Sequence, residues 1–224
     1  RILNSKLIVK SPGIPDTAPL IVKAIANGIP VISEIEFAGY YNTAKTICIT
    51  GSNGKTTTTM LLHHILKNAG LNVGLAGNVG DSFAKQVAEK EFDYYVLELS
   101  SFQLDGMVDF KADIALLMNI TPDHLDRYDN KMENYIASKF RITQNQTEND
   151  WFIYNFDDPN ITEVISKSDF KAQFAPFSLT EPQEVGGYIN NEQQITININ
   201  DQFTMSIHDL ALKGKHNAQN SLAS

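Results

Sequence analysis

Cysteine is almost absent from this sequence: Cys48 is the single one among 224 residues. A lone cysteine excludes an internal disulfide framework and suits a reducing compartment, so we expect a cytoplasmic protein. It lies in the apolar run KTICIT, where a small buried side chain is expected rather than a reactive thiol.

Long hydrophobic runs and an excess of basic residues are also missing. The longest apolar run, ADIALLMNI, is far shorter than the ~18 residues that cross a bilayer, so no membrane insertion is expected. With Lys+Arg 18 against Asp+Glu 26, the net charge is -8, which argues against a nucleic-acid partner. An acidic protein can still bind ATP, because backbone N–H groups, one lysine and a metal hold the phosphates locally.

Two units follow from the pattern of strands and helices. Residues 1–37 predict one β-loop-α-β unit, with strands in SKLIVKS and IPVISEIEF around the helix TAPLIVKAIANG. From residue 38 to 224, apolar strands alternate with helices, which predicts an α/β fold with a mostly parallel sheet flanked by helices. The stretch GGYINNEQQITININ predicts a hairpin, and KGKHNAQNSLAS the start of a helix.

The stretch ITGSNGKTTTT predicts a phosphate-binding loop with an unusual spacer. The pattern G-x-x-x-x-G-K-[ST] needs a glycine where Ile49 stands, five places before Gly54. The stretch nevertheless supplies a strand, a turn of small residues and a helix start, which together gather backbone N–H groups around an anion. We expect Lys55 to reach the β- and γ-phosphates and the Thr56 hydroxyl to bind Mg²⁺. The alternative is a glycine-rich turn with a solvated lysine.

Two other nucleotide motifs fail. GLAGNVG does not match G-x-G-x-x-G, so a dinucleotide fingerprint is absent. NKME carries Glu133 where a guanine-binding N-K-x-D has aspartate, and it lies in a polar stretch, which disfavours a GTPase.

Polar residues follow two of the predicted strands. Glu98 stands inside the apolar run YYVLELSSFQL, and a buried glutamate is costly unless a cation pairs with it, so we expect a magnesium ligand. Ser100, Ser101 and Gln103 follow at the strand end, where open α/β sheets present ligands.

His124 follows the next strand, in NITPDHLDRY. Its two interpretations are a helix-start histidine and a metal contact; we favour the metal contact, because this strand end is expected near the phosphate loop. Asp123 and Asp126 are expected to be helix-start and packing charges.

Six motifs in this order resemble the Mur ligases of peptidoglycan synthesis: TGSNGKTTT, GNVG, LELSSFQL, NITPDHLDRY, SKFRI and KGKHNAQN. The short loop is this family's own spelling, and LELSSFQL with DHLDRY is most similar to the members that add D-glutamate. SPGIP resembles the end of the family's UDP-binding first domain. The resemblance therefore implies that residues 1–37 are the C-terminal part of a Rossmann-like N-terminal domain, and that residues 38–224 are the central P-loop-type ATP-binding domain, truncated at its end. We expect such a part, by itself, not to ligate.

The resemblance also implies a reaction and its residues. ATP phosphorylates the carboxylate of UDP-N-acetylmuramoyl-L-alanine, and D-glutamate attacks the resulting acyl phosphate, in a monomeric protein. The implied catalytic residues are Lys55, His124 and Lys139. The implied ATP contacts are Gly51, Ser52, Asn53, Gly54, Lys55, Thr56, Thr57, Asn217 and Asn220. The implied ligands of two Mg²⁺ ions are Thr56, Glu98, His124 and Lys139, the last as a carbamylated lysine. The implied substrate contacts are Ser11, Pro12 and Gly13 at the uridine end and Asn78, Ser100 and Gln103 at the muramoyl-alanine end.

Two alternatives stay open at this point. Folylpolyglutamate synthase is a related ligase that also forms an amide through an acyl phosphate, although SSFQL argues against it. The other alternative is a nucleotide-binding module without catalytic activity.

Overall fold

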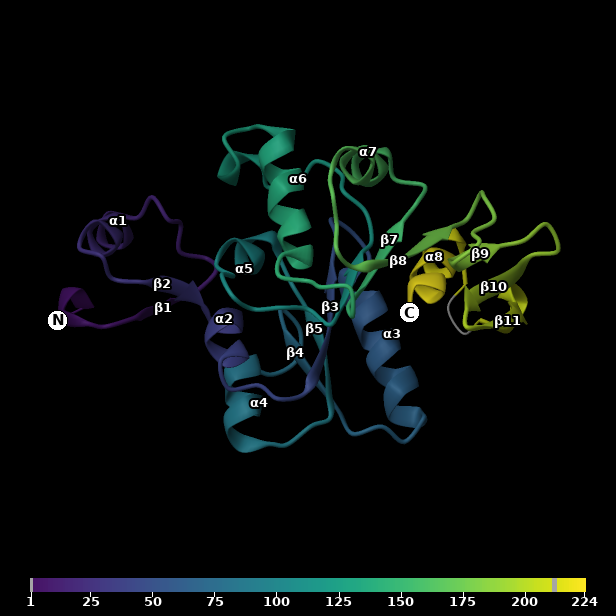
Figure 1. Cartoon of the computed structure of the whole chain (residues 1–224), viewed down its shortest axis with the longest axis horizontal. Helices are drawn as coiled ribbons and strands as arrows, with labels where there is room; N and C mark the ends of the chain where they lie inside the picture. The colour runs from purple at the N-terminus through teal and green to yellow at the C-terminus, as the bar shows by residue number, and fades with distance from the viewer. Residues whose placement is uncertain (1, 211–212) are drawn as a thin grey trace.

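A nine-stranded sheet forms the centre of the protein, with a separate two-stranded sheet near the N-terminus (Figure 1). The computed structural model describes residues 2–210 and 213–224. In the small sheet, β1 (Ile8–Lys10) pairs in parallel with β2 (Val31–Ser33), and α1 (Pro19–Ala26) connects them. The large sheet has the strand order β11-β10-β9-β8-β7-β6-β3-β5-β4. Its strands are β3 (Lys45–Thr50), β4 (Val73–Gly77), β5 (Tyr94–Glu98), β6 (Ile114–Leu117), β7 (Trp151–Asn155), β8 (Gln173–Ser178), β9 (Gly186–Ile189), β10 (Gln194–Ile199) and β11 (Asp201–Ser206).

The predicted mostly parallel sheet is confirmed. All pairings from β4 across to β9 are parallel, and only the β9-β10-β11 end is antiparallel. The β9–β10 pair is the hairpin that the sequence predicts. Strand β11 was not predicted from the sequence; it lies at the sheet edge and most of its residues are exposed.

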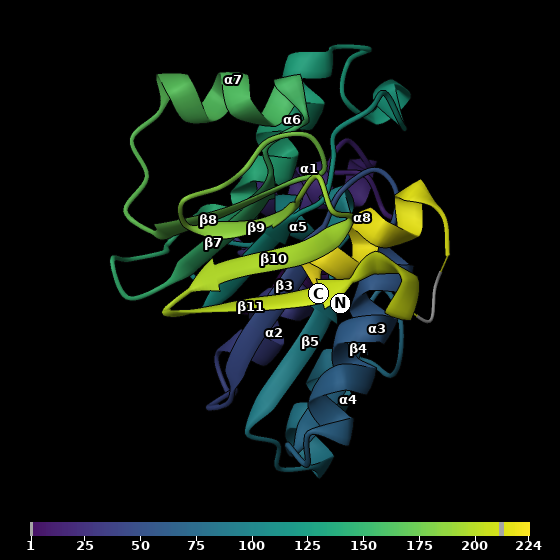
Figure 2. The same cartoon turned by 90° about the vertical axis from the view of Figure 1, so that its right-hand side faces the viewer.

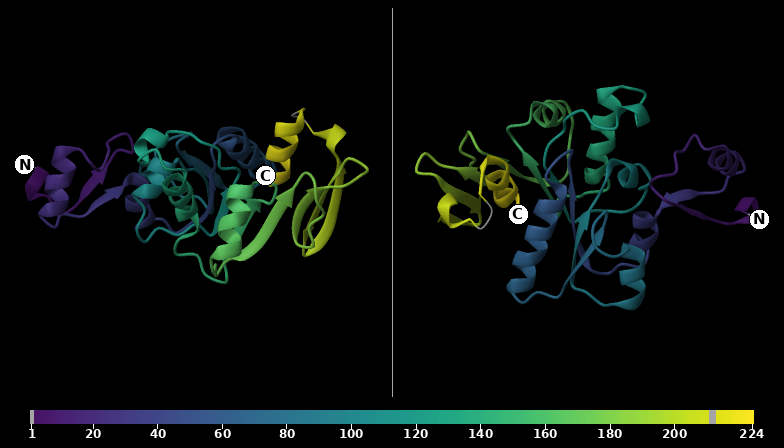
Figure 3. Two further views of the ribbon diagram at one scale, coloured as in Figure 1. Left: turned by 90° about the horizontal axis from the view of Figure 1, so that it is seen from above. Right: turned by 180° about the vertical axis from the view of Figure 1, so that it is seen from behind.

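Helices cover both faces of the large sheet (Figures 1 and 2). One face carries α2 (Glu34–Gly39), α4 (Phe83–Glu89), α5 (Ser101–Asp105), α6 (Met132–Phe140) and α7 (Pro159–Lys167); the other carries α3 (Lys55–Asn68) and α8 (Lys215–Ala223). Neighbouring residues of one strand, such as Val96 and Leu97, belong to the two different core clusters. Side chains alternate along a strand, so a strand covered on both faces is apolar throughout. The views from above and behind show the N-terminal unit and the β9-β10-β11 edge at opposite ends of the molecule (Figure 3).

The expectation of a strand through IPVISEIEF is wrong after Ser33. The Ser33 hydroxyl accepts a hydrogen bond from Glu36 N at 3.1 Å and caps helix α2, whose first turn is acidic. A serine cap and carboxylates near a helix N-terminus both favour helix over strand. Helix α2 therefore runs across the expected domain boundary at residues 37 and 38, a division that stays a prediction.

Helix α6 ends at Phe140, where a 3-10 turn follows. Among the described residues, no helix combines the length and the apolar character that a membrane crossing needs. Cys48 is fully buried in β3, and burial raises the pKa of its thiol.

We therefore expect the Cys48 thiol to be inert in the folded protein. Native protein should react with Ellman's reagent at least ~100-fold more slowly than protein in denaturant, because the buried thiolate becomes accessible only after opening. Absorbance at the released thiolate measures both rates. Equal rates would show that β3 is not a central, protected strand.

Candidate active site

The phosphate-binding loop turns sharply from β3 into α3, and two of its residues must be glycine. Gly51 has φ +154°, and a Cβ there would lie 2.8 Å from Met118 Cβ. Gly54 has φ +84° at the N-cap of α3, and its Cβ would lie 2.6 Å from Asn220 Oδ1. Only glycine tolerates such contacts in this backbone region. The short spacer therefore forms a genuine tight turn at a helix N-terminus.

The loop that follows β6 holds the phosphate loop in place. Asn119 accepts from Asn53 N at 2.8 Å and donates to Asn53 O at 2.9 Å. Ser52 Oγ donates to Thr121 O at 2.8 Å and accepts from Thr121 N at 2.9 Å. The Tyr135 hydroxyl lies 3.2 Å from Ser52 Oγ. These contacts pre-form the loop before any anion arrives.

Two lysines converge on one carbonyl of this loop. Lys55 Nζ and Lys139 Nζ each donate to Gly51 O at 2.8 Å, and Lys139 is only 2% exposed. Burial, and then the positive charge of Lys55, lower the pKa of Lys139 to about 7. Burial also lowers the pKa of Lys55. A large fraction of Lys139 is thus the neutral amine near neutral pH, which is the form that adds carbon dioxide.

Glu98 ends β5 beside the phosphate loop and is 1% exposed. Its carboxylate accepts from Thr56 Oγ1 at 2.8 Å and from Asn78 Nδ2 at 2.9 Å. None of the ion pairs found among the described residues includes Glu98. A buried carboxylate next to a hydroxyl is a set of hard oxygen donors, which suits Mg²⁺.

These protein groups do not form a complete metal cage. Within residues 2–210 and 213–224, no three His, Cys, Asp or Glu side chains lie close enough to hold an ion. Mg²⁺ commonly takes one or two carboxylates together with phosphate oxygens and water, so an open site of this kind fits a nucleotide-bound metal.

A cavity of about 330 Å³ brings together seven of the predicted site residues. It is lined by Pro12, Gly13, Lys55, Asn78, Ser100, Ser101, Phe102, Asp123, His124, Tyr135 and Lys139. Ser11 and Gln103 do not line it. Gln103 is buried and forms a capping box with Ser100, so it orients Ser100 at the start of α5.

His124 lies in this cavity in a costly backbone conformation. Its φ of +49° is left-handed, which costs roughly 1–2 kcal/mol for a residue with a Cβ. It occupies the N-cap of a 3-10 turn (Leu125–Arg127), but its side chain makes no capping hydrogen bond. The imidazole is 58% exposed, 3.6 Å from Asp123 and 5.4 Å from the Phe102 ring centroid. It is therefore available to a ligand.

Three residues of this cavity were not predicted as site residues: Phe102, Asp123 and Tyr135. Asp123, expected to be a helix-start charge, lines the cavity, and its negative charge raises the pKa of both Lys55 and Lys139 against the effect of burial. The ring centroid of Tyr135 lies 5.2 Å from Lys139 Nζ, and its hydroxyl bonds to Ser52. The available signal was its position four residues before Lys139, which places both side chains on one helix face.

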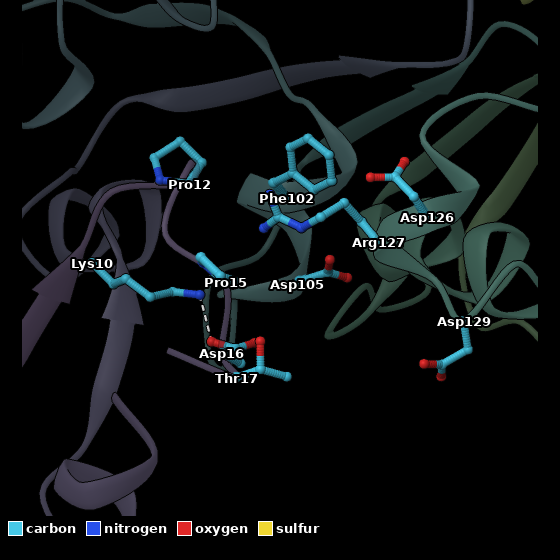
Figure 4. A pocket seen from close by; sticks show the side chains of 10 residues that line it. All are labelled: Lys10, Pro12, Pro15, Asp16, Thr17, Phe102, Asp105, Asp126, Arg127 and Asp129. Atoms are coloured by element: carbon cyan, nitrogen blue, oxygen red, sulfur yellow. Dashed lines mark hydrogen bonds and ion pairs between the residues drawn. The ribbon is translucent and has the colours of Figure 1, made fainter. Parts of the chain in front are cut away.

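A second cavity, of about 230 Å³, adjoins the first and shares Pro12 and Phe102 with it (Figure 4). The Arg127 guanidinium lies 4.6 Å from the centroid of the Phe102 ring, and Lys10 pairs with Asp16 on the opposite wall. The two cavities together give room for a ligand longer than the reacting groups alone.

A third cavity, of about 630 Å³, lies beside the phosphate loop where α8 approaches it. His216 and Gln219 of α8 line it together with Asn53. Asn217 and Asn220, expected near the adenine, are not among its lining residues; Asn220 is buried against Gly54 instead. Helix α8 thus contacts the loop directly, while the adenine contacts stay a prediction.

The lowered pKa of Lys139 predicts a pH-dependent stability. Between about pH 7 and the ordinary lysine value of 10.5, the unfolded chain holds a proton that the folded chain has released, so stability should rise with pH in this window. The rise should reach up to ~1.4 kcal/mol per pH unit, and Lys139→Met should remove it. Urea unfolding at pH 7 and pH 9 in carbonate-free buffer measures this. If the free energy of unfolding changes equally between pH 7 and pH 9 in the unaltered protein and in Lys139→Met, then Lys139 is not buried as a titrating amine.

The sequence was compared with those of known protein families and proteins, and it is similar to one family. Residues 49–224 match the Mur ligase middle domain. The chain is 60% identical over 223 residues to the UDP-N-acetylmuramoylalanine--D-glutamate ligase of Bacteroides thetaiotaomicron, and 56% identical over 223 residues to that of Christiangramia forsetii. These alignments cover 99% and 100% of this chain but 50% of each relative, so the chain spans about half the length of the curated relatives it matches.

Solved structures show the same fold at low identity. A UDP-N-acetylmuramoyl-L-alanyl-D-glutamate--2,6-diaminopimelate ligase aligns with a TM-score of 0.69 and 19% identity, over 97% of this chain and 57% of the other. The MurF ligase of Thermotoga maritima in complex with ADP aligns with a TM-score of 0.59 and 18% identity, over 99% and 62%.

Proposed function

The chain belongs to the Mur ligase family, and from this premise we propose that it is the ATP-binding part of a ligase that adds D-glutamate to UDP-N-acetylmuramoyl-L-alanine in peptidoglycan precursor synthesis. The names of the relatives at 56% and 60% identity support this substrate pair. The observation that carries the proposal is the meeting of Lys55, Lys139 and the Thr56–Glu98 pair around one phosphate loop.

The phosphate loop would hold the group that is transferred. Its backbone N–H groups point out of a helix N-terminus, where partial positive charge favours an anion. Lys55, already beside the loop, would move from Gly51 O to the β- and γ-phosphates. The reaction then needs little covalent chemistry from the protein, because phosphoryl transfer is promoted mainly by positioning and by charge stabilisation.

Thr56 and Glu98 would hold one Mg²⁺ ion, and His124 with the carbamate of Lys139 would serve a second. These ions would supply positive charge that screens the carboxylate of the substrate from the triphosphate. The carbamate would form when the lone pair of the neutral Lys139 amine attacks carbon dioxide and the nitrogen releases a proton. The buried position of Lys139 and its pKa of about 7 support this modification.

The remaining cavity residues would place the substrate. A carboxylate oxygen of the alanine would attack the γ-phosphorus, ADP would leave, and an acyl phosphate would form. The amine of D-glutamate would then attack the acyl carbon, expel phosphate and lose a proton. Asn78 and Ser100, which line this cavity, would orient the alanine end, and Pro12 and Gly13 line the same cavity from the N-terminal unit. Ser11, which precedes them, would contact the more distant uridine end.

The adenine would lie near helix α8, with Asn217 and Asn220 as its contacts. The solved ADP complex of a structural relative supports an adenine nucleotide in this fold. The proposal also places the protein in the cytoplasm, where ATP is available, as a monomer and as a step in cell wall biogenesis and cell division.

The sharpest test of this function is Lys139→Ala in the full-length protein, assayed with ATP, Mg²⁺, UDP-N-acetylmuramoyl-L-alanine and D-glutamate. We expect product formation to fall at least ~100-fold while ATP binding stays within about twofold, because the carbamate acts on the reacting groups rather than on the nucleotide. Short carboxylic acids should restore part of the activity. Lys171→Ala, at an exposed lysine, is the matched control and should behave like the unaltered protein.

Two other outcomes would replace the proposal. Turnover of a pterin substrate in place of the nucleotide sugar would indicate a folylpolyglutamate synthase. Tight ATP binding with no turnover of either substrate, and no effect of Lys139→Ala, would indicate a nucleotide-binding module.

A further inference from the structure

Residues 104–110 comprise the end of α5 and the first part of its connection to β6, and side chains from several distant parts of the chain bond to them. We call them the bracket segment. Their backbone N–H and C=O groups and the Asp105 carboxylate take part. Irregular segments of this kind usually lie on the surface with their backbone groups solvated. Here two of the bonded elements bear on the active-site cavity: α2 connects to the unit that contains Pro12 and Gly13, and α6 carries Tyr135 and Lys139.

The first of these elements is the linker helix α2. Glu36 is 0% exposed, and its carboxylate accepts from three successive backbone N–H groups, those of Val108 at 2.8 Å, Asp109 at 2.9 Å and Phe110 at 2.9 Å. Successive N–H groups form an anion-binding concavity, and hydrogen bonds to a charged acceptor are the stronger kind. None of the ion pairs of the described residues includes Glu36, so these amides are the groups that compensate its charge.

The same linker leads directly to the substrate side of the cavity. Ser33 N donates to Gly106 O at 2.9 Å, and a Cβ on Gly106 would lie 2.8 Å from Ser33 Cβ. Ser33 is the register partner of Lys10 in the β1–β2 pair. Residues 11–13 follow immediately, and Pro12 and Gly13 line the active-site cavity. The bracket segment is therefore linked to residues 11–13 through Ser33 and the pairing of β1 with β2.

The second element is helix α6, which carries Lys139. Ser138 Oγ donates to Asp105 Oδ1 at 2.6 Å, and Arg141 donates from Nε to Leu104 O at 2.8 Å and from Nη2 to Met107 O. Ser138 and Arg141 lie on either side of Lys139 in the sequence. These three bonds, so close to Lys139, fix both the rotation of α6 and its position along its own axis.

Tyr128, which ends the 3-10 turn that begins after His124, also bonds to the bracket segment. Its hydroxyl donates to Asp105 Oδ2 at 2.8 Å. The bracket segment thus contacts Ser33 and α2 on the side of residues 11–13, and α6 and the turn after His124 on the other side. We propose that it sets the distance between residues 11–13 and Lys139, with Glu36 and Arg141 as positioning residues. The expected effect on the reaction rests on the proposed ligase function. The structural link between residues 11–13 and Lys139 does not depend on that function.

Helix α2 offers a matched control for a purely stabilising role. Glu34 also accepts hydrogen bonds, from Ser82 Oγ and Ala84 N at 2.6 Å each, but it binds the start of α4 and not the bracket segment. In Glu36→Gln, an N–H₂ group replaces a carboxylate oxygen that faces N–H donors. In Glu34→Gln, the two bonds to Oε1 lose their charged acceptor and become weaker. Both are expected to lower the melting temperature.

Amide hydrogen exchange in the full-length protein tests the geometry without any assay of activity. Glu36→Gln should raise exchange about tenfold or more in residues 104–110 and in α6, whereas Glu34→Gln should raise it in α4 instead. Arg141→Lys keeps the charge but cannot bind both carbonyls, and it provides the same test from the other side if Glu36→Gln does not fold. Unchanged exchange in α6 for both Glu36→Gln and Arg141→Lys would overturn the proposal.

Kinetics then test the positioning role. Glu36→Gln should raise KM for UDP-N-acetylmuramoyl-L-alanine ~10-fold with KM for ATP within twofold, and Arg141→Lys should lower kcat ~10-fold together with the ¹³C-carbamate signal of Lys139. The double variant should lose less than the product of the two single effects, because both act on one segment. If the unaltered protein shows no turnover, the proposed function fails. Hydrogen exchange still shows whether the bracket segment holds α6 in position. If it turns over and both glutamate variants behave alike, the positioning role is refuted.

Discussion

The carbonyl of Gly51 accepts hydrogen bonds from two lysine ammonium groups, and the rest of the site is arranged around that contact. Both Nζ atoms lie 2.8 Å from one oxygen, so they are at most twice that distance apart. Like charges about 5 Å apart repel by about 3 kcal/mol at an effective dielectric of ~20. A protein keeps such a pair only where anions offset it, and Glu98 and Asp123 supply that negative charge. Burial, and then the charge of Lys55, lower the pKa of Lys139, and these anions oppose both effects.

An overall charge of -8 is therefore compatible with a triphosphate site. What matters is the local field: amide N–H groups at the start of α3, two lysines, and a buried carboxylate that a metal can share. Parallel strands make this possible, because the ends of β3, β5 and β6 all open at one edge of the sheet. Each strand end contributes a different donor, and the β6 loop also fixes the phosphate loop through Asn119 and Thr121.

Much of this arrangement could be predicted from the sequence. The apolar strands alternating with helices predicted the parallel sheet, and the small residues before Lys55 predicted the tight loop, since these are local signals. The position of Glu98 in an apolar strand predicted a buried acid. The region after Ser33 was predicted wrongly because the alternation of acidic and apolar residues in EIEF resembles a strand, while a single serine cap with two acidic residues decided for the helix.

Other features depend on contacts between distant residues, which no local pattern encodes. Lys139 is buried because α6 brings it against the end of β3, and its helical context alone would predict a solvated lysine. Glu36 gives a still weaker signal, since an acidic first turn is ordinary at any helix start; its carboxylate binds amides more than seventy positions away. Asp123 was predicted to be a helix-start charge from its position in the chain, whereas the structure shows that it lines the cavity. In each case the charge of the residue is satisfied by the tertiary structure, so its chemistry is visible only once the fold has brought the strand ends together.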